Sequence, residues 1–169
     1  MTCCVTGHRP SGFNFPRETT CPLYTKYLQQ LNSLIEKLIL SNYTDFITGM
    51  ADGADIDFAM EALKLKKRYP HLTLEAAIPC PIYNANNRTS YHNNRDYIIE
   101  SCDIKNVLSD HYHRGCMDKR NRYMVDKSDV VIAIWNGSQH GGTWNTIQYA
   151  QKKNKKIIYL MLNELQSNY

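Results

Sequence analysis

The chain has 169 residues with an ordinary hydrophobic content of 43%, and it carries a formal net charge of +4. This length predicts a single domain over residues 1–169 that can bury a sizeable core. No apolar run approaches the ~18 residues of a membrane-spanning helix, and the start of the chain is not typical of a signal peptide. We therefore expect a cytoplasmic protein without a membrane partner.

The positive charge does not identify a partner by itself. Part of it comes from two lysine-rich runs, 64–68 and 152–156. Both runs lie late in predicted helices or just beyond them, where cations complement the helix dipole. A nucleic-acid interface would need a basic face with interleaved aromatic residues, which this pattern does not single out. The sequence therefore disfavours nucleic acid as a partner.

The six cysteines form no CxxC pair, and the chain shows no export signal, so we expect reduced thiols. Cys3 and Cys4 are adjacent, and on a strand they would point to opposite faces. His111 and His113 could share one face of a strand as metal ligands, but no third ligand is evident. The sequence therefore predicts no metal site.

Apolar runs of strand length alternate with stretches of helical period along the chain. The first half predicts a strand, a helix, a strand, a helix and a strand at 2–7, 23–40, 44–49, 53–68 and 72–79. The middle predicts a loop over 84–94 that leads into a helix at 97–101. The second half predicts a strand, a helix, a strand, a helix and a strand at 103–109, 118–127, 129–135, 143–153 and 156–162.

The run DVVIAIW at 129–135 is the clearest strand of the chain. It is almost continuously apolar, as expected for a strand that is buried on both faces of a parallel sheet. The alternation of strands and helices predicts βαβ units. We therefore expect a three-layer, Rossmann-like α/β fold, with a mostly parallel sheet and helices on both faces. Ligands of such sheets bind beyond the carboxyl ends of the strands.

Glycine-rich segments follow three of the predicted strands. They are Thr6-Gly7-His8-Arg9-Pro10, Thr48-Gly49-Met50-Ala51-Asp52-Gly53-Ala54-Asp55 and Asn136-Gly137-Ser138-Gln139-His140-Gly141-Gly142-Thr143. Glycine lets backbone N–H groups approach an anion closely, and the start of the following helix adds unpaired N–H groups and a favourable dipole. The three segments predict a pocket for a phosphate-bearing, nucleotide-like ligand.

Several residues in these segments have a structural interpretation beside the functional one. Arg9 could pair with a carboxylate, or it could hold a phosphate as a bidentate fork. Asp52 and Asp55 could stabilise the first turn of the second helix, or they could bind ribose hydroxyls. Gly141 and Gly142 suit a phosphate contact, although a turn into a helix also explains them.

The helix before the clearest strand supplies two further candidates for the pocket, Arg120 and Asn121. Its Arg122 and Asp126 are four residues apart, which predicts a solvated ion pair. None of the standard catalytic motifs GxSxG, HExxH, GxxxxGK[ST] and GxGxxG is present.

Two tryptophans flank the last glycine-rich segment. Trp135 and Trp144 could stack on a base, although an aromatic residue at the end of a core strand more often serves packing. Both interpretations stay open at this point.

Three segments in this order resemble the YpsA-like proteins of the SLOG superfamily, which is named for the DNA-processing protein DprA and the LOG nucleotide hydrolases. They are TGHRP, GMADGAD and RNRYMVDKSDVVIAIWNGSQHGGTWNTIQYA. The similarity covers the chain from Thr6 to about Leu160. It implies a Rossmann-like fold and a ligand such as a nucleotide, ADP-ribose, NAD or a related signalling nucleotide, with no required cofactor. Carried over by motif, the implied pocket residues are Gly7, His8, Arg9, Gly49, Asp52, Gly53, Asp55, Gly141, Gly142, Thr143 and Asn145.

The last motif departs from the LOG pattern at a position that matters for catalysis. LOG-type enzymes have a Pro-Gly-Gly-x-Gly-Thr run with a glutamate three residues beyond the threonine, whereas this chain has Thr146 three residues beyond Thr143. Cleavage of a glycosidic bond needs a carboxylate. Asp52 or Asp55 could replace the missing one.

These observations favour a module that binds a nucleotide-derived ligand, for sensing or for sequestration. The alternative is a nucleotide N-glycoside hydrolase or transferase that uses Asp52 or Asp55. A third hypothesis, a single-stranded nucleic-acid-binding protein similar to DprA, is disfavoured by the modest charge. Because related folds often pair, a homo-oligomer is a further expectation.

Overall fold

A computed structural model describes residues 1–81 and 91–166. Within these residues, six parallel strands form one sheet in the order β4-β3-β2-β1-β5-β6. The strands are β1 (Thr2–Gly7), β2 (Asp45–Thr48), β3 (Thr73–Ile78), β4 (Ile104–Val107), β5 (Val130–Trp135) and β6 (Lys156–Met161). The α-helices are α1 (Pro22–Leu40), α2 (Ala54–Lys66), α3 (Tyr91–Ser101), α4 (Cys116–Lys127) and α5 (Gly141–Lys152), and short 3-10 turns lie at Pro10–Gly12 (η1) and Glu164–Gln166 (η3).

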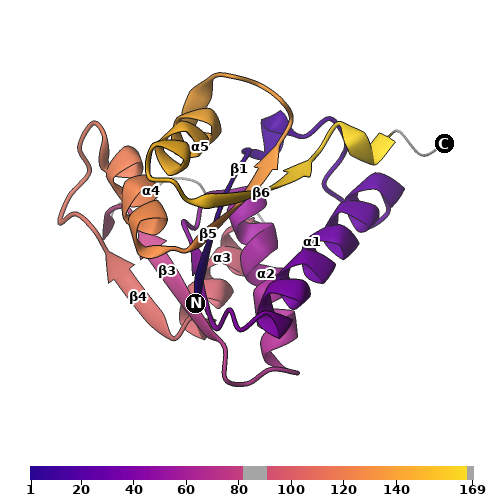
Figure 1. The fold of residues 1–169 in the computed structure, drawn as a ribbon, viewed down its shortest axis with the longest axis horizontal. Coiled ribbons are helices and arrows are strands. Elements are labelled where there is room, and N and C mark those ends of the chain that lie inside the picture. The colour runs from indigo at the N-terminus through magenta and orange to yellow at the C-terminus, as the bar shows by residue number, and fades with distance from the viewer. Residues whose placement is uncertain (82–90, 167–169) are drawn as a thin grey trace.

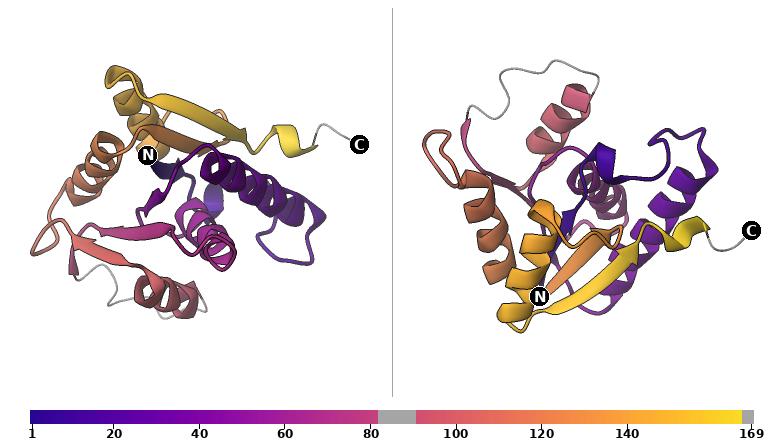
Figure 2. Two further views of the ribbon diagram at one scale, coloured as in Figure 1. Left: turned by 60° about the horizontal axis from the view of Figure 1, so that its bottom comes forward. Right: turned by 90° about the horizontal axis from the view of Figure 1, so that it is seen from above.

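The helices cover both faces of the sheet, which confirms the three-layer, Rossmann-like fold. Helices α1, α2 and α3 lie on one face, and α4 and α5 lie on the other (Figure 1). Figure 2 shows the twisted sheet between these two helical layers. Cys3 packs in the core on the first face and Cys4 in the core on the second, as adjacent residues of a strand must. The six cysteines all lie in the described residues, where they are free thiols.

In helix α1, apolar residues that recur every three or four positions form the face that packs against the core. Its buried residues Tyr27, Leu31, Ile35 and Leu38 follow one another at three- or four-residue spacing, so they form one apolar stripe that packs against the core. Pro22 occupies the first turn, where its missing N–H has no helical partner to lose. Tyr27, Leu31 and Ile35 are fully buried.

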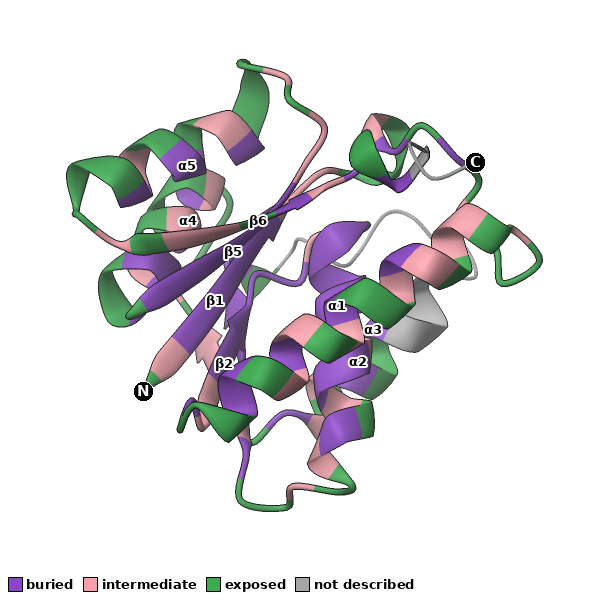
Figure 3. Cartoon of the chain, turned by 45° about the vertical axis from the view of Figure 1, so that its right-hand side comes forward, coloured by how far each residue is buried: buried purple, intermediate pink, exposed green. Residues whose placement is uncertain are grey.

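The central strands are buried along almost their whole length, as the apolar run at 129–135 predicts (Figure 3). Edge strand β4 is different, because Ile104 and Val107 are exposed. Helix α3 begins at Tyr91, so residues 91–94 are helical rather than part of the predicted loop, whereas 84–90 lie outside the described residues. Helix α5 begins at Gly141, two residues before the predicted start.

The strand order creates a crevice between β1 and β5. Strands β2, β3 and β4 follow β1 towards one edge of the sheet, whereas β5 and β6 lie on its other side. The connections that leave β1 and β5 therefore diverge, and the carboxyl ends of these two strands form the point where α/β sheets bind ligands. Among the described residues, no helix is long and apolar enough to cross a membrane.

Candidate functional site

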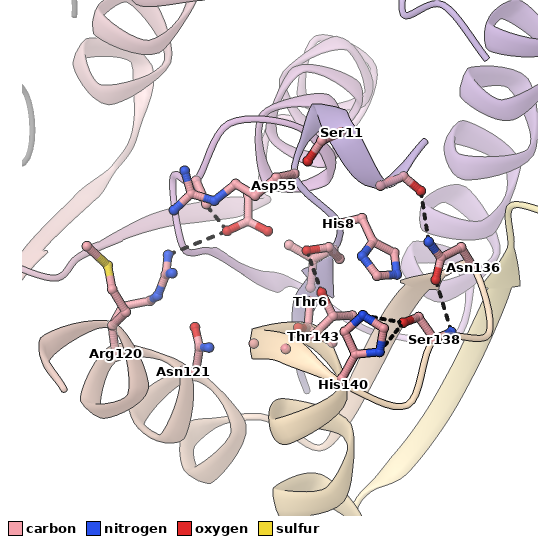
Figure 4. Close-up of a pocket in the computed structure, with 18 residues that line it drawn as sticks. Thr6, His8, Ser11, Asp55, Arg120, Asn121, Asn136, Ser138, His140 and Thr143 are labelled. Carbon is pink, nitrogen blue, oxygen red and sulfur yellow. Dashed lines mark hydrogen bonds and ion pairs between the residues drawn. The ribbon is translucent and has the colours of Figure 1, made fainter. Parts of the chain in front are cut away.

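A cavity of about 550 Å³ lies at the carboxyl ends of β1 and β5 (Figure 4). Its walls come from the segment after β1, the start of α2, the first turns of α4 and the segment between β5 and α5. The lining residues are Val5, Thr6, Gly7, His8, Arg9, Ser11, Gly12, Ala51, Asp55, Met117, Arg120, Asn121, Asn136, Ser138, His140, Gly141, Gly142 and Thr143.

The structure brings most of the predicted site residues together around this cavity. Those that line it are Thr6, Gly7, His8, Arg9, Asp55, Arg120, Asn121, Asn136, Gly141, Gly142 and Thr143. The predicted residues that do not line it are Gly49, Asp52, Gly53, Gly137 and Asn145. Contact of any of these residues with a ligand stays a prediction.

One end of the cavity holds a buried ion pair. Arg120 Nη1 lies 3.5 Å from Asp55 Oδ2, and it also donates to the carbonyl oxygen of Gly49. The backbone N–H of Ala51 donates to the same Asp55 oxygen at 3.2 Å. Burial raises the pKa of Asp55, while the Arg120 guanidinium and the Ala51 N–H act in the opposite direction. Asp55 is therefore a buried carboxylate at the cavity whose position is set by Arg120 and Ala51, and whose pKa is set by burial together with these two contacts.

Gly53 acts behind the wall of the cavity. It is the N-cap of α2 with a φ of +100°, and a Cβ atom there would lie only 2.4 Å from the carbonyl oxygen of His8. The next N–H, that of Ala54, donates to this carbonyl at 3.1 Å. Gly53 is thus needed because the backbone that follows β1 touches the start of α2 here. Asp52 precedes this contact and does not line the cavity.

The other end of the cavity is formed by the start of α5. His140 is the N-cap residue, and within the described part of the chain its side chain makes no capping hydrogen bond. The Thr143 hydroxyl donates to the carbonyl oxygen of Gly7 at 2.9 Å, which ties α5 to the end of β1. The first N–H groups of α5 have no partner inside their own helix. This end therefore offers a favourable environment for an anion.

His8, His140 and two hydrogen-bonded polar residues surround this anion-favouring end. Asn136 Nδ2 donates to the carbonyl oxygen of Gly12 at 3.0 Å, and the Ser138 N–H donates to Asn136 Oδ1 at 3.0 Å. The Ser138 hydroxyl lies 2.9 Å from Nδ1 of His140. Figure 4 shows His8, His140, Asn136 and Ser138 at one end and Asp55 and Arg120 at the other. The cavity therefore has two chemically different ends, one that favours an anion and one that holds a carboxylate paired with a guanidinium.

A second buried ion pair holds the segment after β1 in place. Arg17 Nη2 donates to Asp57 Oδ1 at 2.6 Å and reaches the carbonyl oxygen of Gly53 at 3.4 Å. The Tyr24 hydroxyl donates to the same Asp57 oxygen at 2.9 Å. These contacts fasten the segment that contains η1 onto the start of α2. They explain how Ser11 and Gly12 reach the cavity wall.

Six lining residues other than Val5 were not among the predicted site residues, namely Ser11, Gly12, Ala51, Met117, Ser138 and His140. Ala51, Ser138 and His140 belong to the glycine-rich segments from which the sequence predicts the pocket, so they could have been included. Met117 lies three residues before Arg120, which places it on the same helix face. For Ser11 and Gly12 the sequence carries no local signal, because their position depends on Arg17 and Asp57, 40 residues apart.

The predicted ion pair between Arg122 and Asp126 is wrong. Arg122 Nε pairs with Asp118 at 2.7 Å, one turn in the other direction, and Asp126 pairs with Lys153, the residue that follows α5, at 3.0 Å. A four-residue spacing allows either neighbour, and Lys153 decides the outcome by supplying a cation to Asp126.

The two tryptophans serve packing. The rings of Trp135 and Trp144 stack with centroids 5.4 Å apart and planes 11° from parallel. Trp135 Nε1 donates to the carbonyl oxygen of Ser138 at 2.9 Å. The stack therefore joins the end of β5, the first turn of α5 and the segment between them.

The described residues contain no group of three His, Cys, Asp or Glu side chains that could hold a metal ion. His111 and His113 lie in an exposed segment with ring centroids 6.1 Å apart.

Comparison with known proteins gives both sequence relatives and a solved structure. An uncharacterized SPbeta prophage-derived protein, YoqJ of Bacillus subtilis, is 33% identical over 144 residues, which cover 78% of this chain and 84% of that protein. A UPF0398 protein of Bacillus pumilus is 24% identical over 96% of this chain and 89% of its own length.

The solved structure shares the fold. It is that of DNA processing protein A from Helicobacter pylori, whose single-stranded DNA binding mode has been described; the TM-score is 0.62 at 22% identity. The match covers 94% of this chain but only 64% of that one. The family model YpsA, described as the YspA SLOG family, matches residues 3–165. With nearly its whole length covered by that model, the chain belongs to the YspA SLOG family.

Proposed function

We propose that the protein binds a nucleotide-derived ligand such as ADP-ribose, NAD or a related signalling nucleotide in the cavity between β1 and β5, for sensing or sequestration. One observation carries this proposal: the start of α5 opens, without a capping side chain in the described residues, onto a cavity of about 550 Å³. This volume is in the range of about 300–1,000 Å³ found for small-molecule sites.

The two ends of the cavity suit the two ends of such a ligand. A phosphate fits at Gly141 and Gly142, where helix N–H groups and the dipole favour negative charge. Asp55 and Arg120 at the other end supply an acceptor and a donor for ribose hydroxyls or for a base. A nucleotide would thus lie across the floor formed by Thr6 and Thr143 (Figure 4).

Binding without cleavage is favoured by the residue that follows the glycine-rich segment. Thr146 stands where a LOG-type enzyme has its glutamate, and its hydroxyl donates to the carbonyl oxygen of Gly142 at 2.8 Å. It also accepts a hydrogen bond from Asn121 Nδ2 at 2.9 Å. This position therefore holds a hydroxyl that already donates one hydrogen bond and accepts another, where hydrolysis would need a carboxylate.

A thermal-shift titration tests the proposal. We expect ADP-ribose at about one hundred times its Kd to raise the Tm by roughly 5–10 °C, and adenosine, which lacks phosphate, to raise it much less. Asp55→Asn should reduce the shift, while Asp52→Asn, the matched control outside the cavity, should leave it unchanged. If millimolar ADP-ribose, NAD and AMP all leave the Tm unchanged, the proposal is wrong.

The second candidate, a nucleotide N-glycoside hydrolase, is favoured by one observation. Asp55 is the one carboxylate among the described residues that lines the cavity, and burial raises its pKa. Chromatography of AMP and NAD after incubation would show free base if the protein is this enzyme, and Asp55→Asn would abolish the release. We expect no base release above buffer. A single-stranded oligonucleotide at ~150 mM salt in the same panel tests nucleic-acid binding.

A further inference from the structure

Two neighbouring residues, Ala54 and Gly12, hold His8 in place. Its carbonyl oxygen accepts the N–H of Ala54 at 3.1 Å. Gly12 lies against its ring so closely that a Cβ atom there would be 2.6 Å from His8 Cβ and 2.8 Å from Nδ1. Gly12 is itself held through its carbonyl oxygen by Asn136. These contacts therefore hold His8 at the cavity wall before any ligand arrives.

The His8 ring carries a polar atom that lacks a partner in the part of the surrounding protein that the structure describes. Nε2 of His8 is buried and has no hydrogen-bond partner among the described residues. Buried polar atoms in proteins are nearly always paired, and an exception calls for a physical reason. His8 lines the cavity, and a small rotation of its ring would present Nε2 to a ligand group placed at this end, which would supply the missing partner.

The charges that face the cavity favour a neutral His8 when the site is empty. The titratable and charged lining residues besides His8 are Arg9, Asp55, Arg120 and His140. Asp55 lies at the opposite end of the cavity, where Arg120 pairs with it (Figure 4). Burial lowers the pKa of His8, and the nearby His140 lowers it too, although the Asn136 amide acts in the opposite direction. The empty site thus lacks a carboxylate at the His8 end.

We propose that His8 takes up a proton when the anionic group of the ligand binds, so that its imidazolium becomes a charged donor to that group. The proton comes from solvent and forms a second N–H bond on the imidazole, while no bond of the ligand forms or breaks. This inference rests on the proposed function, because it needs an anion at the start of α5. It adds that His8 discriminates charged from uncharged ligands and links their affinity to pH.

The sign of the pH dependence follows from the linkage between protonation and binding. A nearby anion favours the charged ring, so the pKa of His8 is higher in the complex than in the free protein. Affinity must therefore rise as the pH falls through the interval between these two pKa values, by at most tenfold per pH unit for one proton. ADP-ribose is the suitable probe, because both phosphates of its diphosphate are esterified and stay singly charged between pH 5.5 and 8.

Isothermal titration calorimetry with ADP-ribose in buffers of different ionisation enthalpy measures the proton uptake directly. Between pH 6 and 7 we expect an uptake of up to one proton per ADP-ribose for the wild-type protein. His71→Gln, a matched control at an exposed position outside the cavity, should show the same uptake. His140→Gln should retain uptake, whereas His8→Gln should lose it together with the pH dependence of the affinity.

A measurement on the unaltered protein covers the case in which His8→Gln abolishes binding altogether. The NMR signal of the His8 Cε1–H proton, titrated with pH, should show a midpoint below the usual histidine value of about 6.5 in the free protein. Saturating ADP-ribose should raise that midpoint.

The outcomes separate this inference from the function on which it rests. ADP-ribose binding without proton uptake, uptake that persists in His8→Gln, or uptake lost only in His140→Gln overturns the inference and leaves the proposed function intact. If no nucleotide of the panel binds at any pH, the proposed function is wrong and the inference falls with it.

Discussion

The sheet has a buried carboxylate beside a cavity both where its strands begin, here called the amino edge, and where they end, here called the carboxyl edge. The two carboxylates differ in how tightly the protein itself binds them. At the amino edge, Glu75 accepts a hydrogen bond from the Tyr123 hydroxyl at 2.5 Å and one from Lys127 at 2.6 Å. The cavity beside it measures only about 260 Å³. At the carboxyl edge, the Asp55–Arg120 pair is 3.5 Å long and faces a cavity of twice that volume.

The difference teaches how a structural charge cluster can be told from a binding site. Glu75 has a short, charge-assisted partner on each oxygen, so each of its two oxygens already accepts a hydrogen bond within the protein. Asp55 has a looser ion pair, and the opposite end of its cavity has an uncapped helix start and a buried imidazole nitrogen without a partner in the described residues. Polar groups whose hydrogen-bonding capacity the protein leaves unused, next to a cavity, are what indicate a ligand site.

The largest effect on stability is expected at the carboxyl edge. Arg120→Met leaves a buried carboxylate without its guanidinium, so the free energy of unfolding should fall by about 3–5 kcal/mol. Arg122→Met is the matched control on the same helix, because Arg122 is largely exposed, and it should change stability by less than about 0.5 kcal/mol. Urea denaturation at pH 7 measures both values. Equal losses of unfolding free energy in the two variants would contradict the conclusion that Arg120 stabilises the buried carboxylate of Asp55.

The same variant makes a prediction about pH. Loss of Arg120 removes the main influence that lowers the pKa of Asp55, so burial raises this pKa further. Folded Asp55 then binds its proton more tightly than unfolded Asp55, and the variant loses stability as the pH rises from about 4. The stability deficit of Arg120→Met should therefore be smaller at pH 4.5 than at pH 7. A deficit that is constant with pH would show that Asp55 is not the group left unpaired.

A smaller effect is expected at the amino edge. Glu75→Gln removes the charge-assisted bond to Lys127, whose side chain is about half exposed and can be solvated, so the loss should be about 1–2 kcal/mol. Affinity for ADP-ribose should not change, because Glu75 lies at the opposite edge of the sheet. Glu100→Gln on the exposed side of α3 is the control. Weaker ADP-ribose binding in Glu75→Gln would abolish the distinction between the edges.

The smallest expected effect on stability is that of a substitution at Gly142, which should stabilise the fold and weaken ligand binding. Apart from its chain neighbours and the backbone of its own helix, no atom of the described residues lies within 4 Å of a Cβ placed on Gly142, so Gly142→Asp fits. A carboxylate in the first turn of α5 should add about 0.3–1 kcal/mol to stability relative to the neutral Gly142→Asn. It should also weaken ADP-ribose binding, because it occupies the anion position. Calorimetry on both variants measures this, and unchanged affinity would place the phosphate elsewhere.

The fold was largely predictable because local and global signals agree. The apolar run at 129–135 predicts β5 to within one residue, since a strand buried on both faces has no need of polar alternation. Strand β4 gave a weak signal for the opposite reason, because at the sheet edge Ile104 and Val107 are exposed. Contacts in space, rather than period in sequence, keep β4 beside β3.

The candidate site was predictable only as a set of loops. Parallel strands place their carboxyl ends at one edge, which brings the segments after β1 and β5 together. The sequence could not separate Asp52 from Asp55, because the turn at Gly53 decides which one faces the cavity. Nor could it place Ser11 and Gly12, whose positions depend on the pair of Arg17 with Asp57.

The stacked indoles give this site an optical signal of its own. Trp135 and Trp144 are the only tryptophans of the chain, so its entire tryptophan emission originates from one stack. One indole is hydrogen-bonded to the carbonyl oxygen of Ser138, a residue of the cavity wall. A ligand that shifts the segment between β5 and α5 would change the polarity around this indole and hence its emission maximum. The unlabelled protein is therefore its own fluorescent probe for occupancy of the cavity.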